Sequence, residues 1–88
     1  MIAWGVDTGI SRNAASVARA RLVGVTGTIH VWKWQGSTGS PLSIEHTMAP
    51  EVARLYAAHG GGIMAADGYY APELRRGLGS SIHVTIQG

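Results

Sequence analysis

The first part of the chain alternates between apolar and polar positions, which is the pattern of strands that are buried on one face. Residues 2–6 form a short apolar run that ends at "DTG", so we expect a buried first strand there. Residues 14–25 alternate in their centre, which predicts a half-buried second strand whose arginines face water. Residues 28–36 alternate again, and a tight turn at Thr26 and Gly27 is expected to join these two segments as a hairpin.

The third predicted strand has two chemically different faces. One face carries Ile29, Val31 and Lys33, and the other carries His30, Trp32 and Trp34. Two tryptophans on the same face most often pack under a helix or against another domain, although aromatic rings also stack on the bases of single-stranded nucleic acid. We expect Trp32 and Trp34 to pack in this way and not to bind nucleic acid.

The apolar spacing changes to intervals of three and four between residues 42 and 59, which predicts an amphipathic helix. Pro50 cannot lie deep inside a helix, because it lacks an amide donor and clashes with the preceding turn. Regular helix is therefore expected from about Met48, with Thr47 as its N-cap. The three glycines at 60–62 are expected to end it.

The remaining segments predict two further strands separated by a short helix. Residues 62–70 begin with an apolar run typical of a buried parallel strand, and residues 81–88 alternate. Between them, residues 71–79 carry Pro72 near the start, basic residues in the last turn and a glycine at the end, which predicts a short helix. The order β-β-β-α-β-α-β predicts an α/β mixed sheet of the ribonuclease H-like type, with helices packed on the sheet.

Composition indicates one small domain. The chain has 88 residues, and we expect residues 1–88 to be a single domain, partial or cut from something longer, because the last predicted strand closes the chain. Only 14% of the residues are charged, below the usual ~25%, so part of the surface is expected to be covered by another domain or subunit. No apolar run reaches the ~18 residues of a membrane span, and we expect a cytoplasmic protein without a membrane partner.

Charge and cysteine content limit the possible chemistry. The net charge is +2, and four of the seven basic residues but one of the five acidic residues lie in residues 1–36. A basic first half is compatible with a polyanionic partner, although solvated arginines on strands explain it equally well. The absence of cysteine excludes disulfides and thiolate metal sites.

Two aspartates, Asp7 and Asp67, each close an apolar strand. If these strands are adjacent and parallel, the two carboxylates meet at one rim of the sheet, where ligands of open α/β sheets bind. Neighbouring carboxylates repel each other, and a divalent cation held by oxygen ligands, Mg²⁺ or Mn²⁺, relieves that repulsion. The alternative is that each aspartate caps its own turn by accepting backbone amide hydrogen bonds.

Longer stretches of the chain resemble the nuclease domain of phage terminase large subunits. The stretches are "AWGVDTGISRNAASVARARLVGVTGTIHVWKW", "TMAPEVARL" and "IMAADGYYAPELRRGLGSSIHV", and the resemblance runs from the first to the last of them, over nearly the whole length of the chain. The resemblance implies a metal-dependent DNA endonuclease that hydrolyses phosphodiesters with a metal-activated water. Asp7 matches that family's first metal-binding aspartate and Asp67 its second acidic ligand. The family's third acid lies further along and has no counterpart here, and Glu73 is more typical of a helix first turn.

The resemblance also implies partners and a setting. Double-stranded DNA is the expected substrate, with Arg12, Arg75 and Arg76 as candidate contacts to its backbone. No phosphate-loop motif occurs in the chain, so an ATPase motor domain or other packaging-complex subunits are expected as partners. The expected location is the cytoplasm of a phage-infected or lysogenic bacterial host.

The sequence is also compatible with three other functions. The same fold can serve as a non-catalytic binding or assembly module, with the acids reduced to turn caps. A Holliday-junction resolvase normally carries four clustered acids, more than this chain offers. "DTGIS" is also similar to the phosphate-binding turn of sugar kinases and actin-like ATPases, but those proteins are much longer and close a second lobe over the nucleotide.

Overall fold

The computed structural model describes residues 1–9 and 14–87, and it confirms the predicted order of strands and helices. Five strands form one sheet in the order β3-β2-β1-β4-β5. β1, β2 and β3 pair antiparallel, whereas β4 pairs parallel with both β1 and β5. The strands are β1 (Ile2–Asp7), β2 (Ala14–Val23), β3 (Thr26–Gln35), β4 (Ile63–Asp67) and β5 (Thr85–Gln87).

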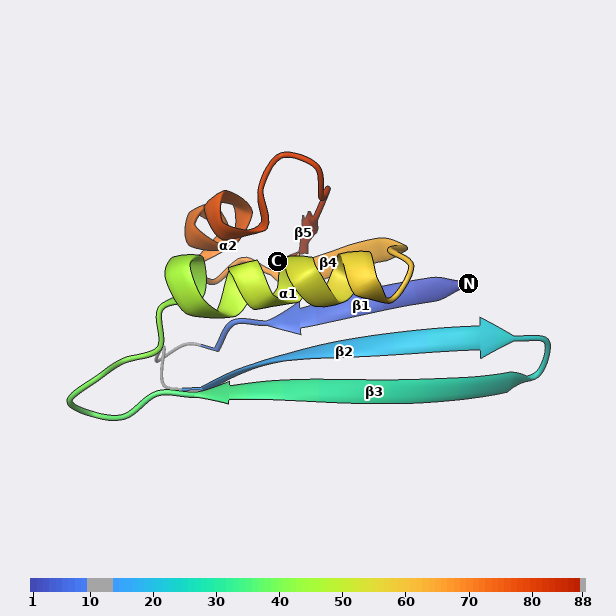
Figure 1. The fold of residues 1–88 in the computed structure, drawn as a ribbon, viewed down its shortest axis with the longest axis horizontal. Helices are drawn as coiled ribbons and strands as arrows, with labels where there is room; N and C mark the ends of the chain where they lie inside the picture. Colours follow the sequence, from blue (N-terminus) through green and yellow to red (C-terminus); the bar gives the residue numbers. More distant parts are fainter. Residues whose placement is uncertain (10–13, 88) are drawn as a thin grey trace.

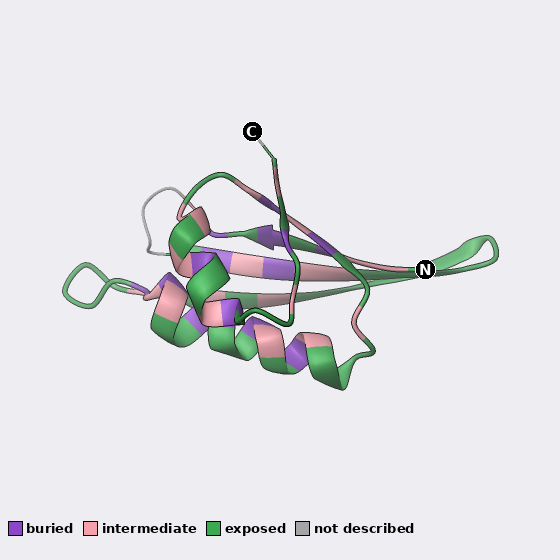
Figure 2. Ribbon diagram, turned by 90° about the horizontal axis from the view of Figure 1, so that it is seen from above, coloured by how far each residue is buried: buried purple, intermediate pink, exposed green. Residues whose placement is uncertain are grey.

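The helices cover one face of the sheet, as Figures 1 and 2 show. They are a single π-helical turn, η1 (Ile44–Met48), which runs directly into α1 (Ala49–Ala58), and α2 (Ala71–Leu78). Their apolar sides meet alternate strand residues in one core, built around Trp4, Val6, Val17, Met48, Val52, Met64, Ala66 and Leu74. The other residues of each strand project from the opposite face, which no helix of the described residues covers. No helix among those residues is long and apolar enough to cross a membrane.

The hairpin turn lies two residues earlier than predicted. The register pairs Val23 with Thr26, so the turn is formed by Gly24 and Val25 and not by Thr26 and Gly27. Gly24 has a φ of +62°, a conformation that glycine adopts without a steric penalty. The hairpin projects beyond the helices as a ribbon that is open to solvent (Figure 1).

The prediction that the arginines of β2 face water is wrong for Arg19. Arg19 lies on the same face as Val17, beside the end of α1, and is partly buried. Its guanidinium lies 6.0 Å from the Trp4 ring centroid and donates a hydrogen bond of 3.1 Å to the His59 carbonyl. Arg21 is exposed, as expected. The predicted alternation is present in this strand. The prediction fails at Arg19 because the helices cover that part of the face on which the arginines lie.

Regular α-helix begins at Ala49, within one residue of the predicted start, but a π-helical turn from Ile44 precedes it and moves the N-cap. Ser43 and not Thr47 is the N-cap, since the Ser43 hydroxyl accepts a hydrogen bond of 3.0 Å from the His46 amide. The π turn places Pro50 in the first turn of α1, where its missing amide donor is not needed. Of the predicted strand 81–88, residues 81–84 form a loop and Thr85–Gln87 pair with β4, while Gly88 lies outside the described residues. Val84 is buried, and its carbonyl accepts a hydrogen bond from Arg75, which holds the preceding loop against α2.

A candidate two-aspartate metal site

The structure brings Asp7 and Asp67 to the same end of two neighbouring parallel strands. Val6 of β1 lies opposite Ala66 of β4, and the next residue on each strand is an aspartate. Side chains on adjacent strands that are in register project from the same face. Because Val6 and Ala66 are buried under the helices, both aspartates project from the open face. The prediction that these two strands are adjacent and parallel, with an aspartate at the same end of each, is confirmed.

Small side chains form the surface around the two aspartates. Both carboxylates border one shallow, open depression, which is also lined by Gly5, Val6, Ser16, Ala18, Ala65, Ala66 and Gln87. Nothing lies within 4 Å of the position that a Cβ on Gly5 would take. Most of the residues that line this depression are therefore small, and Gly5 leaves open space beside Asp7.

Each aspartate also caps a turn, as the alternative interpretation expected. Asp7 Oδ1 accepts a hydrogen bond of 2.9 Å from the Gly9 amide, and Asp67 Oδ1 accepts one of 3.1 Å from the Tyr69 amide. Both are Asx turns, in which a carboxylate bonds its own backbone two residues on. Each bond uses one oxygen of its carboxylate. Turn capping and metal binding are therefore compatible at both positions.

A buried threonine ties the two strand ends together. Thr8 follows Asp7 and is fully buried, and its hydroxyl donates a hydrogen bond of 2.6 Å to the Tyr69 carbonyl. The same oxygen lies 3.3 Å from Asp67 Oδ1. Tyr70 has a φ of +57°, the one positive value for a non-glycine residue in the described part of the chain. Sequence reasoning missed Thr8, whose only signal was its place directly after a strand-closing aspartate.

The donor set fits a hard divalent cation held by two carboxylates. Carboxylate oxygens suit Mg²⁺ and Mn²⁺, and Mg²⁺ is commonly held by one or two carboxylates while it keeps several waters. Within residues 1–9 and 14–87 no group of three or more metal-ligating side chains occurs, so no third acid joins the pair there. Glu73 lies in the first turn of α2, and its carboxylate is 3.8 Å from the Arg76 guanidinium.

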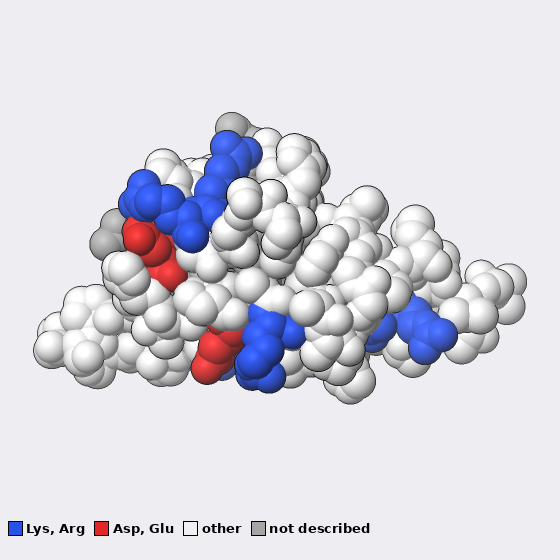
Figure 3. Space-filling view, turned by 45° about the horizontal axis from the view of Figure 1, so that its top comes forward, with Lys and Arg blue, Asp and Glu red and all other residues white. Residues whose placement is uncertain are grey.

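The structure does not bring the predicted DNA-binding arginines of α2 to the aspartates. Arg75 and Arg76 line a separate depression beside the loop that precedes β5. Figure 3 shows basic and acidic side chains side by side on the helix-covered side. Arg12 lies outside the described residues.

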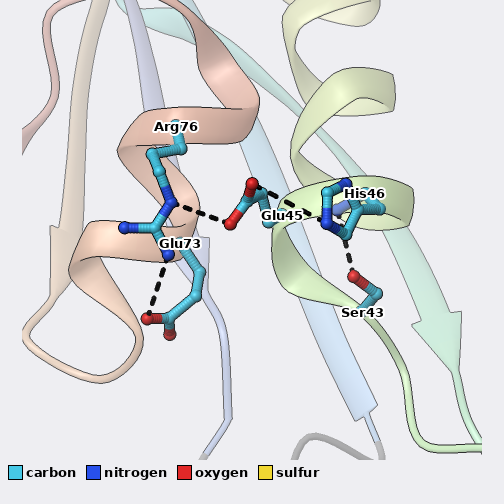
Figure 4. Close-up of polar contacts among 5 residues, drawn as sticks. All are labelled: Ser43, Glu45, His46, Glu73 and Arg76. Atoms are coloured by element: carbon cyan, nitrogen blue, oxygen red, sulfur yellow. Dashed lines mark hydrogen bonds and ion pairs between the residues drawn. The ribbon is translucent and has the colours of Figure 1, made fainter.

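Arg76 belongs to a cluster of charged side chains, formed with Glu45, His46 and Glu73, that links α2 to η1 (Figure 4). Its Nε donates a hydrogen bond of 2.8 Å to Glu45 Oε1. This contact lowers the pKa of the Glu45 carboxyl and raises the pKa of the Arg76 guanidinium. His46 lies 3.7 Å from the other oxygen of Glu45. The positive charge of Arg76 is therefore largely balanced by its neighbours.

Comparisons with models of protein families, with curated proteins and with solved structures find no match for this chain.

Proposed function

We propose that this chain is a metal-dependent DNA endonuclease domain, in which Asp7 and Asp67 together hold Mg²⁺ or Mn²⁺. The observation that carries the proposal is the position of the two carboxylates, which follow an in-register pair of parallel strands and project from the same open face. Carboxylates that come close together repel each other, and a cation held between them relieves that repulsion.

The chemistry assigned to the site needs few protein groups. A divalent ion, when bound, lowers the pKa of a water and stabilises the oxygen that leaves a phosphodiester. Asp7 and Asp67 would fix the position of the ion, and the two Asx turns and the Thr8 hydroxyl would hold the carboxylates in place. The shallow floor of small residues would admit the backbone of a DNA duplex.

The resemblance to terminase nuclease domains supports the same proposal and extends it to partners. In that setting the substrate is double-stranded DNA, and the domain works with an ATPase motor and other subunits of a packaging complex. Arg75 and Arg76 remain proposed backbone contacts, on a different side of the molecule from the aspartates.

A second function has its own support. Both aspartates cap turns, and the described residues supply no third acid beside them. A ribonuclease H-like module that binds or assembles without catalysis would need nothing more from these residues. The two proposals differ in whether the carboxylates are needed for an activity or only for stability.

Cleavage of supercoiled plasmid DNA with Mn²⁺ separates the two functions. The wild-type chain is expected to give nicked and linear DNA, and Asp7→Asn and Asp67→Asn to abolish both products. Glu51→Gln is the matched control, because it makes the same carboxylate-to-amide change on α1 and leaves an oxygen to accept the Trp34 hydrogen bond. Equal cleavage by the wild type and Asp7→Asn would contradict the nuclease proposal, and so would the absence of cleavage by the folded wild type.

A further inference from the structure

One row of side chains crosses the open face of the sheet at the level of the two aspartates. The register pairs Lys33 of β3 with Ser16 of β2, and Ser16 with Asp7 of β1. On the far side, Asp67 of β4 pairs with Gln87 of β5. Two strand spacings separate the backbones of Lys33 and Asp7, a distance of about 10 Å.

Two tryptophans fix the direction in which Lys33 projects. Trp32 stacks on Trp4 with ring centroids 5.9 Å apart, and the Trp34 indole donates a hydrogen bond to the Glu51 carboxylate on α1. Both neighbours of Lys33 are thereby held on the helix side. Because successive side chains of a strand point to opposite faces, Lys33 projects from the same face as Asp7.

Lys33 is a cation without a counter-charge among the described residues. It is exposed, and no carboxylate in that part of the chain pairs with it. It also lines a depression together with Asp7 and Ser16. Arg76 offers the contrast, since Glu45 and Glu73 lie against its guanidinium. An ammonium with no acidic partner on the face that carries the aspartates is available to an anionic ligand.

We propose that Lys33 binds a backbone phosphate of the DNA strand that is cleaved at Asp7 and Asp67. The inference rests on the proposed nuclease function and adds the path of the substrate. The DNA backbone crosses the strands, passing from β4 and β1 over β2 toward β3. Successive phosphates of one strand rise about 3.4 Å along the duplex, so the backbone distance of about 10 Å places Lys33 within about three nucleotides of the reacting phosphate.

The test measures the salt dependence of binding to a short fluorescein-labelled DNA duplex by fluorescence anisotropy, in EDTA so that no cleavage occurs. Each phosphate contact contributes about 0.9 to the slope of log K against log salt for duplex DNA. Lys33→Met is expected to reduce this slope by about 0.9 and to weaken binding at moderate salt. Lys33→Arg is expected to retain the slope. Arg54→Met removes an exposed cation from α1, on the helix side, and is expected to leave the slope unchanged.

The outcomes separate this inference from the nuclease proposal. A wild-type slope for Lys33→Met would overturn the role of Lys33 and leave the nuclease proposal standing if the wild type cleaves plasmid DNA. Equal reductions for Lys33→Met and Arg54→Met would also overturn it, because binding would then depend on overall charge. A folded wild-type chain that neither binds the duplex nor cleaves it would overturn both proposals.

Discussion

Val6 of β1 lies opposite Ala66 of β4, and this one register pair sets the geometry of the candidate site. It places the following residues, Asp7 and Asp67, on the same face at the same rim. Val6 and Ala66 are 60 residues apart in the sequence, and the pairing of two parallel strands places them opposite each other. A slip of one residue in either strand would send one carboxylate toward the core.

The Thr8 hydroxyl is expected to stabilise the rim that carries the aspartates. Thr8→Val removes the donor of the part-buried hydrogen bond to the Tyr69 carbonyl and should lower the free energy of unfolding by about 0.5–1.5 kcal/mol. Thr8→Ser keeps the hydroxyl and loses one methyl, a cost of about 0.8 kcal/mol. Urea denaturation measures both variants. A free energy of unfolding for Thr8→Val equal to that of the wild type would contradict this role.

Gly62 is expected to be required where the chain passes from α1 to β4. Its φ is +126°, and a Cβ there would lie 2.4 Å from the Ile2 carbonyl oxygen. Gly62→Ala should therefore lower the stability by at least about 1–3 kcal/mol, and the melting temperature by roughly 4–8 °C for each kcal/mol. Gly39→Ala is the matched control, because nothing lies within 4 Å of its Cβ position. Equal melting temperatures for the two variants, measured by circular dichroism, would count against this steric account.

The stability that the Glu45–Arg76 ion pair contributes to the fold is expected to decrease as the pH falls. The hydrogen bond from Arg76 lowers the pKa of Glu45 in the folded chain. The pair thus stabilises the fold above the ordinary pKa of a glutamate, and this contribution disappears as the pH falls through the lowered pKa. Arg76→Met should return the pKa of Glu45 toward its ordinary value in an NMR titration, whereas Arg54→Met should not. A Glu45 pKa that is the same in Arg76→Met and the wild type would exclude the pair as the cause.

The order of the elements could be predicted because its signals are local. Apolar runs closed by "DTG" and "ADG" marked β1 and β4, and the proline and glycine around residues 71–79 marked α2. The opposite faces of β3 also followed from simple alternation, and the register confirms them. These patterns involve residues that are close together in the sequence, so the sequence alone is enough to recognise them.

Several features of the site could not be predicted because they depend on contacts across the fold. Alternation says that Arg19 and Ala18 face opposite ways, but only the position of the helix layer decides which of them is covered. The place of the hairpin turn follows from how β2 and β3 pair, and both Gly24 and Gly27 were available to form it. Lys33 and Asp7 fall in one row across the sheet only through the pairing of three strands.

Calorimetric titration with Mn²⁺ tests the central claim most directly, because the proposed site consists of the two carboxylates themselves. The wild-type chain is expected to bind Mn²⁺, and Asp7→Asn and Asp67→Asn are each expected to lose most of that binding while remaining folded. Glu51→Gln should bind as the wild type does. Mn²⁺ binding that survives both aspartate substitutions, or a folded wild-type chain that does not bind Mn²⁺, would contradict a metal site at Asp7 and Asp67.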